Sequence, residues 1–317
     1  MGFVYELKMA LKAMGDMRAP KPTFSTDQIP DLTGRVMIVT GGNTGIGKET
    51  IKVLLQHNAK VYMASRSPQK AEAAIAELKE ETGKEAVFLE LDLTSYASIH
   101  KAAEEFLSKE ENLHVLFNNA GLMLCPIDML GPEDYDLQWF TNVVGPFLFT
   151  KLLLPALIAG KASSPDGHTR IIATSSSGSY LGIIHWDTLK DGPARRKTNS
   201  QELYFQSKFA NVVVTRQLAK RYADQGIIAV SLNPGNISTD LQRYMSGIQK
   251  RIIATLLQPV QLGALTQLWA GTMPGALELN GGYLIPWARV GSCRREAYDD
   301  ALGEKLWEWL ENAVNDK

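Results

Sequence analysis

The fold is decided by the stretch Arg35-Val-Met-Ile-Val-Thr40-Gly41-Gly42-Asn43-Thr44-Gly45-Ile46-Gly47, in which an apolar run leads directly into a glycine-rich turn. Residues compatible with a helix, Lys48-Glu49-Thr50, follow the turn. Glycines let a backbone turn sharply and approach a pyrophosphate, whose charge then lies at the positive end of the next helix. The stretch therefore predicts a strand, a phosphate-binding turn and a helix.

Two other interpretations of the turn stay open. The spacing of Gly42, Gly47 and Lys48 almost matches a nucleoside-triphosphate P-loop, but that loop needs Ser or Thr after the lysine to hold magnesium, and Glu49 stands there. The other interpretation is a tight turn without a ligand, although three spaced glycines exceed what a turn requires.

Beyond a preamble that ends near Leu32, short apolar runs alternate with longer amphipathic segments, which is typical of βαβ units around a parallel sheet. The predicted strands are Arg35–Thr40, Lys60–Ala64, Ala86–Glu90, Leu113–Asn118, Arg170–Ser175, Ile227–Asn233 and Gly282–Ile285. We expect an α/β fold in which residues 32–317 form one doubly wound, seven-stranded parallel sheet, a Rossmann-type three-layer sandwich. Residues 1–31 are expected to form an amphipathic helix and a linker.

The composition indicates an ordinary soluble globular protein, since 45% of the 317 residues are hydrophobic and 21% are charged. A formal net charge of -1 gives no electrostatic reason to expect nucleic acid as a partner. Cys125 and Cys293 have neither the number nor the spacing of a disulfide framework or a metal site, so we expect a cytoplasmic protein without a bound metal. No run approaches the roughly 20 apolar residues of a membrane span.

Residues 1–17 place Val4, Leu7, Leu11 and Met14 on one face of a helix. Such a face can pack on the protein's own surface or lie in the interface of a membrane or lipid droplet. Both interpretations stay open.

The end of the second predicted strand indicates which dinucleotide the turn would hold. An acid about 20 residues after the glycines binds the ribose hydroxyls of NAD, whereas a basic group binds the 2′-phosphate of NADP. Ser65 and Arg66 stand there without an acid, and a guanidinium grips a phosphate through paired, charge-assisted hydrogen bonds. This favours NADP(H) over NAD(H), the alternative being that Arg66 is a solvated loop charge.

The candidate acid/base group is Tyr204, which has Lys208 four residues later on the same helical face. The reference pKa of tyrosine is about 10, and a neighbouring ammonium lowers it by stabilising the phenolate. A surface Tyr–Lys pair at this spacing also arises by chance.

Over about Leu32–Pro286, several motifs in a fixed order resemble the short-chain dehydrogenase/reductase family. The sequence most resembles fungal members that are similar to retinol dehydrogenases and to the oxidoreductase domain of WW-domain oxidoreductases. These motifs are Thr40-Gly-x-x-x-Gly-Ile-Gly47, Asp92, Asn118-Asn119-Ala120-Gly121, Thr141-Asn142, Ser175-Ser176, Tyr204-x-x-x-Lys208 and Pro234-Gly235. The resemblance implies a hydride-transferring enzyme of Rossmann fold.

The resemblance implies a catalytic tetrad of Asn142, Ser176, Tyr204 and Lys208. Tyr204 would exchange a proton with the substrate oxygen, Ser176 would hydrogen-bond that oxygen, Lys208 would lower the tyrosine pKa and hold the nicotinamide ribose, and Asn142 would hold a relay water. Ser175 and Ser177 flank Ser176, and only the family position selects among the three; the others can satisfy backbone groups.

The resemblance also implies a set of cofactor contacts. Asp92 would meet the adenine amino group, 119–121 the adenosine side, and Ile237 with Thr239 the carboxamide; Asp92 and Thr239 could instead cap helices. The full set is Gly41, Asn43, Thr44, Gly45, Ile46, Gly47, Ser65, Arg66, Asp92, Leu93, Asn119, Ala120, Gly121, Tyr204, Lys208, Pro234, Gly235, Ile237 and Thr239.

Two segments, about 177–201 and 240–260, are expected to border the substrate. The first is longer than in many members of the family and contains His185, which we interpret as structural because a lone histidine in a loop usually is. The second has an apolar face that would roof the pocket in this family, or would pack on the sheet or on a second subunit in a homodimer. A lipophilic aldehyde, ketone or alcohol is the expected substrate; a dinucleotide-binding sensor or scaffold is the alternative function.

Overall fold

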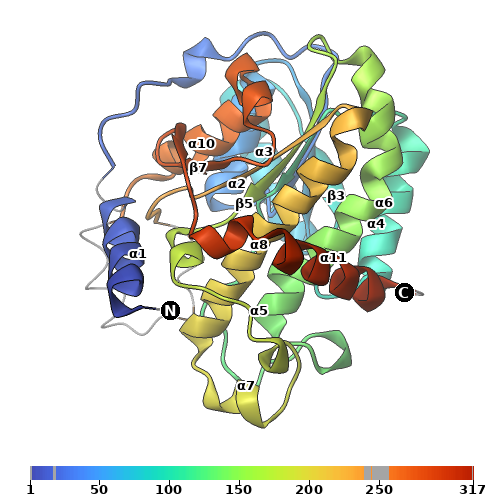
Figure 1. The fold of residues 1–317 in the computed structure, drawn as a ribbon. Coiled ribbons are helices and arrows are strands. Elements are labelled where there is room, and N and C mark those ends of the chain that lie inside the picture. Colours follow the sequence, from blue (N-terminus) through green and yellow to red (C-terminus); the bar gives the residue numbers. More distant parts are fainter. Residues whose placement is uncertain (1, 17–18, 239–243, 245–256, 316) are drawn as a thin grey trace.

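The computed structural model describes residues 2–16, 19–238, 244, 257–315 and 317. Eight strands form one sheet in the order β3-β2-β1-β4-β5-β6-β7-β8 (Figure 1), and all neighbours are parallel except β7 and β8. The strands are β1 (Val36–Thr40), β2 (Lys60–Ser65), β3 (Val87–Glu90), β4 (Val115–Asn118), β5 (Thr169–Thr174), β6 (Ile227–Leu232), β7 (Tyr283–Ile285) and β8 (Arg289–Gly291).

The prediction of seven strands is wrong by one, because β8 extends the edge of the sheet in the antiparallel direction. It has three residues, and the side chain of its central Val290 is 65% exposed. So short and exposed an edge strand has no run of apolar residues that a sequence pattern could reveal. The seven predicted strands are all present, and the doubly wound α/β class is confirmed.

Helices cover both faces of the sheet, which explains why every residue of β1, β5 and β6 is buried. The α-helices are α1 (Phe3–Asp16), α2 (Gly45–Gln56), α3 (Pro68–Thr82), α4 (Tyr96–Lys109), α5 (Leu137–Trp139), α6 (Gly145–Gly160), α7 (Pro193–Lys197), α8 (Ser200–Tyr222), α10 (Val260–Thr272) and α11 (Asp300–Val314), with a π-helix, η3 (Phe140–Val144), before α6. The short 3-10 helices are η1 (Thr26–Gln28), η2 (Pro132–Asp134), η4 (Lys161–Ser163), η5 (Ser177–Tyr180), η6 (Trp186–Thr188), η7 (Ala223–Gln225), η10 (Pro274–Leu279) and η11 (Arg295–Tyr298).

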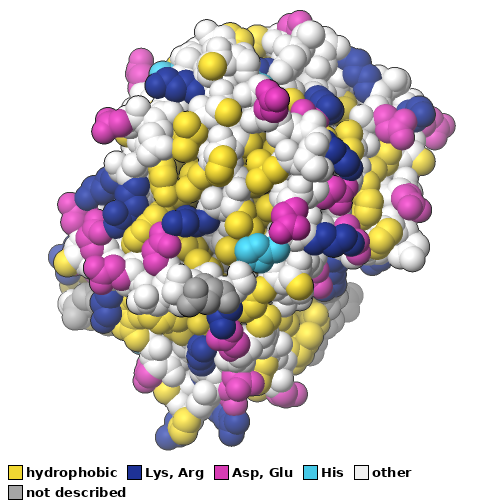
Figure 2. All heavy atoms as spheres, turned by 90° about the vertical axis from the view of Figure 1, so that its right-hand side faces the viewer, with side chains coloured by type: hydrophobic (Ala, Val, Ile, Leu, Met, Phe, Trp, Pro, Cys, Tyr) yellow, Lys and Arg dark blue, Asp and Glu magenta, His cyan; other side chains and the backbone are white. Residues whose placement is uncertain are grey.

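Two hydrophobic clusters separate the helices into layers. One cluster joins the sheet to α4, α6, α8 and α11, and the other joins it to α2, α3 and α10 (Figure 1). The side of the molecule that carries α4 and α6 has acidic and basic side chains interspersed (Figure 2), in agreement with the net charge of -1.

One helical stretch, Leu137–Ser163, is long and apolar enough to cross a membrane, contrary to the sequence expectation that no such run exists. Its most apolar window is 67% buried, and Phe147, Phe149 and Leu153 pack in the core beside α4. The apolar character of this stretch therefore serves the core, as in the central helix of a globular domain.

Helix α1 lies on the protein surface with Met9 and Ala13 turned inward and buried. The predicted apolar face is turned outward, since Val4, Leu7 and Leu11 are between 48% and 77% exposed. That face does not pack on the described part of the protein, and its contact with a membrane stays a prediction.

Candidate active site

The parallel register brings three loops to one edge of the sheet. Thr40 pairs with Ala64, and Val39 pairs with Met63 and Phe117, so the glycine turn, the end of β2 and the loop after β4 leave the sheet side by side. Ligands of open α/β sheets bind at this carboxyl edge. A cavity of about 1050 Å³ lies there.

The cavity collects nearly all residues that the sequence predicts for the site. Those that line it are Gly41, Asn43, Thr44, Gly45, Ile46, Gly47, Ser65, Arg66, Asp92, Leu93, Asn119, Ala120, Gly121, Ser176, Tyr204, Lys208, Pro234, Gly235 and Ile237. Asn142 lies behind the lining, and Thr239 lies outside the described residues. Residues from six strand ends therefore meet in one cavity.

The glycine turn is packed so tightly that side chains are excluded from it. A Cβ on Gly47 would lie 2.4 Å from the carbonyl oxygen of Gly41, and Gly41 itself has a φ of +67°. Helix α2 begins at Gly45, so its amino end faces the cavity. Such a cradle fits the diphosphate of a dinucleotide.

The end of β2 presents groups without partners to the cavity. The Ser65 side chain is buried, and its hydroxyl has no hydrogen-bond partner among the described residues; the same holds for the hydroxyl of Thr141, which also lines the cavity. Arg66 is exposed at the rim. Lys70, in the first turn of α3, lines the cavity as well; sequence reasoning missed it, although its place four residues after Arg66 was a signal.

Asn119 ties the loop after β4 to the glycine turn. Its side-chain nitrogen donates to the carbonyl oxygen of Thr40 at 2.8 Å, and the Thr40 hydroxyl oxygen accepts from the backbone nitrogens of Asn119 and Ala120 at 3.0 Å. The Asn119 amide thus fixes two walls of the cavity to each other.

Asp92 does not cap helix α4, because Ser95 is the capping residue and accepts from the backbone nitrogen of Ser98. The Asp92 carboxylate instead accepts from the backbone nitrogen and the hydroxyl of Thr94. Its half-buried side chain borders the cavity.

Helix α8 carries Tyr204 and Lys208 to the inner end of the cavity. The Lys208 ammonium lies 5.9 Å from the centre of the Tyr204 ring and donates to the carbonyl oxygen of Thr174 at 2.9 Å. The Ser176 side chain lies near enough to Tyr204 to lower the pKa of the phenol, and its hydroxyl oxygen accepts from the backbone nitrogen of Gly178 at 3.1 Å. The three side chains therefore form one polar group in an otherwise buried place.

Burial controls the charge states of this group. It raises the pKa of Tyr204 to about 12, with the hydrogen bond from Ser176 acting in the opposite direction, and it lowers the pKa of Lys208 to about 8. Burial outweighs the effect of Ser176, so in the protein alone the pKa of Tyr204 lies above its ordinary value. That Lys208 lowers this pKa stays a prediction.

The three consecutive serines have different surroundings. The Ser175 hydroxyl donates to the carbonyl oxygen of Lys208 at 2.6 Å and so joins β5 to α8. Ser176 is the serine whose side chain lowers the pKa of Tyr204. The geometry thus supports the choice that the family position suggested.

Asn142, in the π-helix, uses its whole side chain to clamp neighbouring segments. Its oxygen accepts from the backbone nitrogen of Leu122 at 2.8 Å, and its nitrogen donates to the Leu122 carbonyl and to the Ser207 hydroxyl. A Cβ on Gly121 would lie 3.1 Å from the Asn142 oxygen and 3.2 Å from the Lys208 nitrogen, which shows how close the amide and the ammonium are. The relay water stays a prediction.

Opposite the glycine cradle, the inner end of the cavity has apolar walls. The side chains there include Ala13, Leu122, Met123, Leu124, Leu181, Phe205 and Leu257. The expected roof, 240–260, lies mostly outside the described residues. His185 is exposed and does not line the cavity, in keeping with a structural role.

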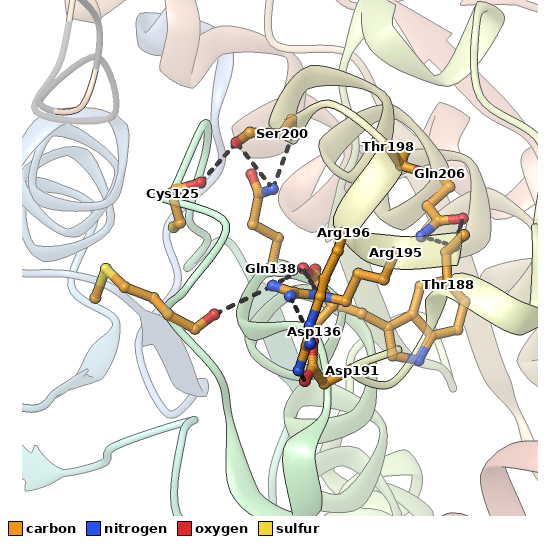
Figure 3. Close-up of polar contacts among 12 residues, drawn as sticks. Cys125, Asp136, Gln138, Thr188, Asp191, Arg195, Arg196, Thr198, Ser200 and Gln206 are labelled. Atoms are coloured by element: carbon orange, nitrogen blue, oxygen red, sulfur yellow. Dashed lines mark hydrogen bonds and ion pairs between the residues drawn. The ribbon is translucent and has the colours of Figure 1, made fainter. Parts of the chain in front are cut away.

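A buried polar network supports this apolar end from behind (Figure 3). Arg195 pairs with Asp136 at 3.0 Å, each with a side chain 2% exposed, and Arg195 also donates to the carbonyl oxygen of Met129. Gln138 accepts from the backbone nitrogen of Leu124 and donates to the carbonyl oxygen of Ser200. The wall segment 122–129 is thereby fixed to the start of the helix that carries Tyr204.

Comparison with known proteins agrees with this geometry. A family model described as short chain dehydrogenase matches residues 35–188. A short-chain dehydrogenase/reductase of Armillaria gallica is 57% identical over 307 residues, which is 97% of this chain and 99% of that protein. The chain belongs to the short-chain dehydrogenase/reductase family.

This chain is also similar to a human enzyme and to two solved structures. Human retinol dehydrogenase 11 is 35% identical, over 95% of this chain and 92% of that protein. A crystal structure of a Mycobacterium paratuberculosis protein has a TM-score of 0.71 at 27% identity, over 91% and 96% of the two chains. A 3-ketoacyl-(acyl-carrier-protein) reductase from Brucella melitensis, solved with NADH, has a TM-score of 0.63 at 25% identity, over 80% and 96%.

The dehydrogenase/reductase is thus an oxidoreductase that uses a nicotinamide cofactor on CH–OH or carbonyl groups. The residues present fit such a cofactor, because the cradle at Gly47 excludes a side chain and the buried Ser65 hydroxyl lacks a partner within the described chain. Family membership also removes the P-loop interpretation of the turn.

Proposed function

We propose that this enzyme interconverts a lipophilic aldehyde or ketone and its alcohol with NADP(H), and that Tyr204 is its acid/base group. The observation that carries the proposal is the meeting of Ser176, Tyr204 and Lys208 at the inner end of a cavity whose outer end is the glycine cradle. The cytoplasm is the proposed location, supported by two buried cysteines that form no disulfide with each other.

The rim of the cavity supports NADP(H) over NAD(H). Ser65, Arg66 and Lys70 line it where β2 meets α3, and no acid follows the strand. Two cations and a hydroxyl suit a 2′-phosphate dianion.

The bound nicotinamide would supply or accept the hydride. For reduction, Tyr204 donates its phenolic proton to the substrate oxygen, and Ser176 donates a hydrogen bond to the same oxygen. A Tyr204 pKa of about 12 keeps the phenol protonated at neutral pH, which suits the reducing direction. Lys208, held by the Thr174 carbonyl, places a positive charge beside the phenolate that forms.

The apolar end supports a lipophilic substrate. Leu122, Met123, Leu124 and Phe205 border it, and such walls bind an apolar body while the few polar groups orient its reacting oxygen. Relatives named retinol dehydrogenase 11 in mouse and human, 36% and 35% identical, agree with this substrate class.

The test is oxidation of NADPH with a panel of lipophilic aldehydes. Tyr204→Phe should lower kcat by about 10²- to 10⁴-fold, the contribution of a positioned acid. The control is Tyr222→Phe, the same change at the far end of α8, where kcat should not change. NADPH binding without consumption by any aldehyde, or full activity of Tyr204→Phe, would refute the proposal and favour a sensor or scaffold.

A further inference from the structure

A buried carboxylate stands outside the part of the chain that the family model matches. Asp16, the last residue of α1, is 8% exposed, whereas the family match begins at residue 35. Its Oδ2 accepts from the Tyr180 hydroxyl at 2.8 Å and from the side-chain nitrogen of Asn233 at 3.1 Å. Both donors are at most 1% exposed, so the carboxylate replaces water with these two hydrogen bonds.

The two donors belong to the two loops that border the reactive end of the cavity. Tyr180 ends η5, the turn that begins directly after Ser176. Asn233 precedes the Pro234–Gly235 turn, and its side-chain oxygen accepts from the backbone nitrogen of Gly235 at 3.0 Å. Asp16 therefore joins the loop of the catalytic serine to the turn on the other side of the cavity.

The contacts continue to the backbone of the serine itself. The Tyr283 hydroxyl donates to the carbonyl oxygen of Ser176 at 3.1 Å, and it hydrogen-bonds the Ser179 hydroxyl at 3.0 Å. The Tyr283 ring meets the Tyr180 ring edge to face, 5.9 Å between centres. A shift of Tyr180 would therefore move Tyr283 and, through it, the backbone of Ser176.

Helix α1 also contributes to the cavity directly. Ala13, one turn before Asp16, is one of the lining residues and is 5% exposed. At the start of the same helix Glu6 pairs with Arg294 at 2.9 Å; Arg294 also pairs with Glu296 and donates to the carbonyl oxygen of Tyr180 at 3.2 Å. Asp16 therefore contacts Tyr180 directly, whereas Glu6 reaches it only through Arg294, which Glu296 also holds.

We propose that Asp16 is a positioning residue for the reaction: through Tyr180 and Asn233 it fixes the Ser176 loop and the Pro234–Gly235 turn at the separation that hydride transfer needs. The N-terminal helix is then a working part of the active site. This inference rests on the proposed function, because it concerns the geometry of that same site.

The experiment uses full-length Asp16→Ala, Asp16→Asn, Tyr180→Phe and Glu6→Gln, with thermal unfolding, NADPH affinity by fluorescence, and kcat with the best aldehyde. Asp16→Ala should lower kcat at saturating substrates by about 10- to 100-fold, the effect of a displaced reacting group. Asp16→Asn, which keeps an acceptor for Tyr180, should regain part of the loss. Glu6→Gln removes one of the two carboxylates that pair with Arg294 and should leave kcat unchanged, because Glu296 still holds the guanidinium beside Tyr180.

Tyr180→Phe alone should lower kcat, and it should add little in the Asp16→Ala background, because both changes cut the same connection. If Asp16→Ala does not fold, Asp16→Asn and Tyr180→Phe decide the question. Unchanged kcat in these variants, or an equal loss in Glu6→Gln, would show that Asp16 only anchors the helix and would overturn the inference.

Failure of the proposed function would look different, since the wild-type protein would then turn over no aldehyde. In that event NADPH affinity is the readout, because the Gly235 turn borders the cofactor cavity. A several-fold weaker affinity in Asp16→Ala than in Glu6→Gln supports the positioning role, and equal affinities overturn it.

Discussion

At the outer, cofactor end of the cavity, the walls are short loops that directly follow strands. At the inner, substrate end, the walls come from α1, the 122–129 segment and α8, which are far apart in the sequence. The first end presents exposed cations, Arg66 and Lys70, and the hydroxyl of Ser65, which has no partner among the residues that the structure describes. The second end has apolar walls backed by ion pairs and hydrogen bonds within the protein.

This difference separates two tasks. A charged cofactor is bound by groups that keep free hydrogen-bonding capacity for it, so its site can be made from local loops. A lipophilic substrate has few groups that can form hydrogen bonds, so its orientation depends on rigid cavity walls. The buried contacts of Asp136 and Asp16 supply that rigidity at two places behind the substrate end.

Breaking the Arg195–Asp136 pair should have the largest effect on the substrate end. Arg195→Met leaves the Asp136 carboxylate buried without its cation, which should lower the free energy of unfolding by about 3–5 kcal/mol. The KM for aldehyde should rise while the affinity for NADPH changes little. Urea unfolding and steady-state kinetics measure both.

The matched control is Arg196→Met on the same helix, because the Arg196 side chain is 68% exposed and pairs with Asp191 at the surface. Arg196→Met should lower the free energy of unfolding by less than about 1 kcal/mol. Equal losses in the two variants, or a loss of NADPH affinity as large as that of aldehyde, would contradict the separation of the two ends.

At the cofactor end, Arg66→Ala should raise the KM for NADPH by about 10- to 100-fold, the contribution of one or two charge-assisted hydrogen bonds. The KM for NADH should change far less, because NADH has no 2′-phosphate. Arg66→Lys keeps the positive charge but loses the planar guanidinium, so its KM for NADPH should lie between those of the wild type and Arg66→Ala. Equal effects on the two cofactors would refute the phosphate role.

The smallest expected effect concerns the pH dependence of stability at Lys208. Its pKa is about 8 in the folded protein against 10.5 ordinarily, so the unfolded chain binds more protons between these values. The stability that Lys208 contributes is therefore full above about pH 10.5 and is lost as the pH falls through about 8, by at most about 1.4 kcal/mol per pH unit.

Unfolding by urea at pH 7.5, 8.5 and 9.5, without cofactor, checks this prediction. The difference in unfolding free energy between wild type and Lys208→Met should shift in favour of wild type as the pH rises. A flat or opposite trend would show that burial does not control the lysine charge.

The cofactor end could be predicted residue by residue, because a strand, its turn and its helix are contiguous and each glycine has a local reason. The substrate end could not. Ala13 lines the cavity from a helix that is far in the sequence from the other lining residues. Arg195 and Asp136 are 59 residues apart, and no sequence motif indicates that they form a pair. The family motif identified Asn142, but nothing in the sequence indicated that its side chain hydrogen-bonds the backbone of Leu122.

The sequence by itself determined the α/β class, seven of the eight strands, the glycine cradle and the family, since these depend on periodicity and on backbone conformations that few residues allow. Only the tertiary structure decided that Ser175 bonds the backbone while Ser176 faces Tyr204, that burial raises the pKa of Tyr204, and that Asp16 lies behind the site. These features depend on distance and on exclusion of water between segments remote in the chain, which no local pattern encodes.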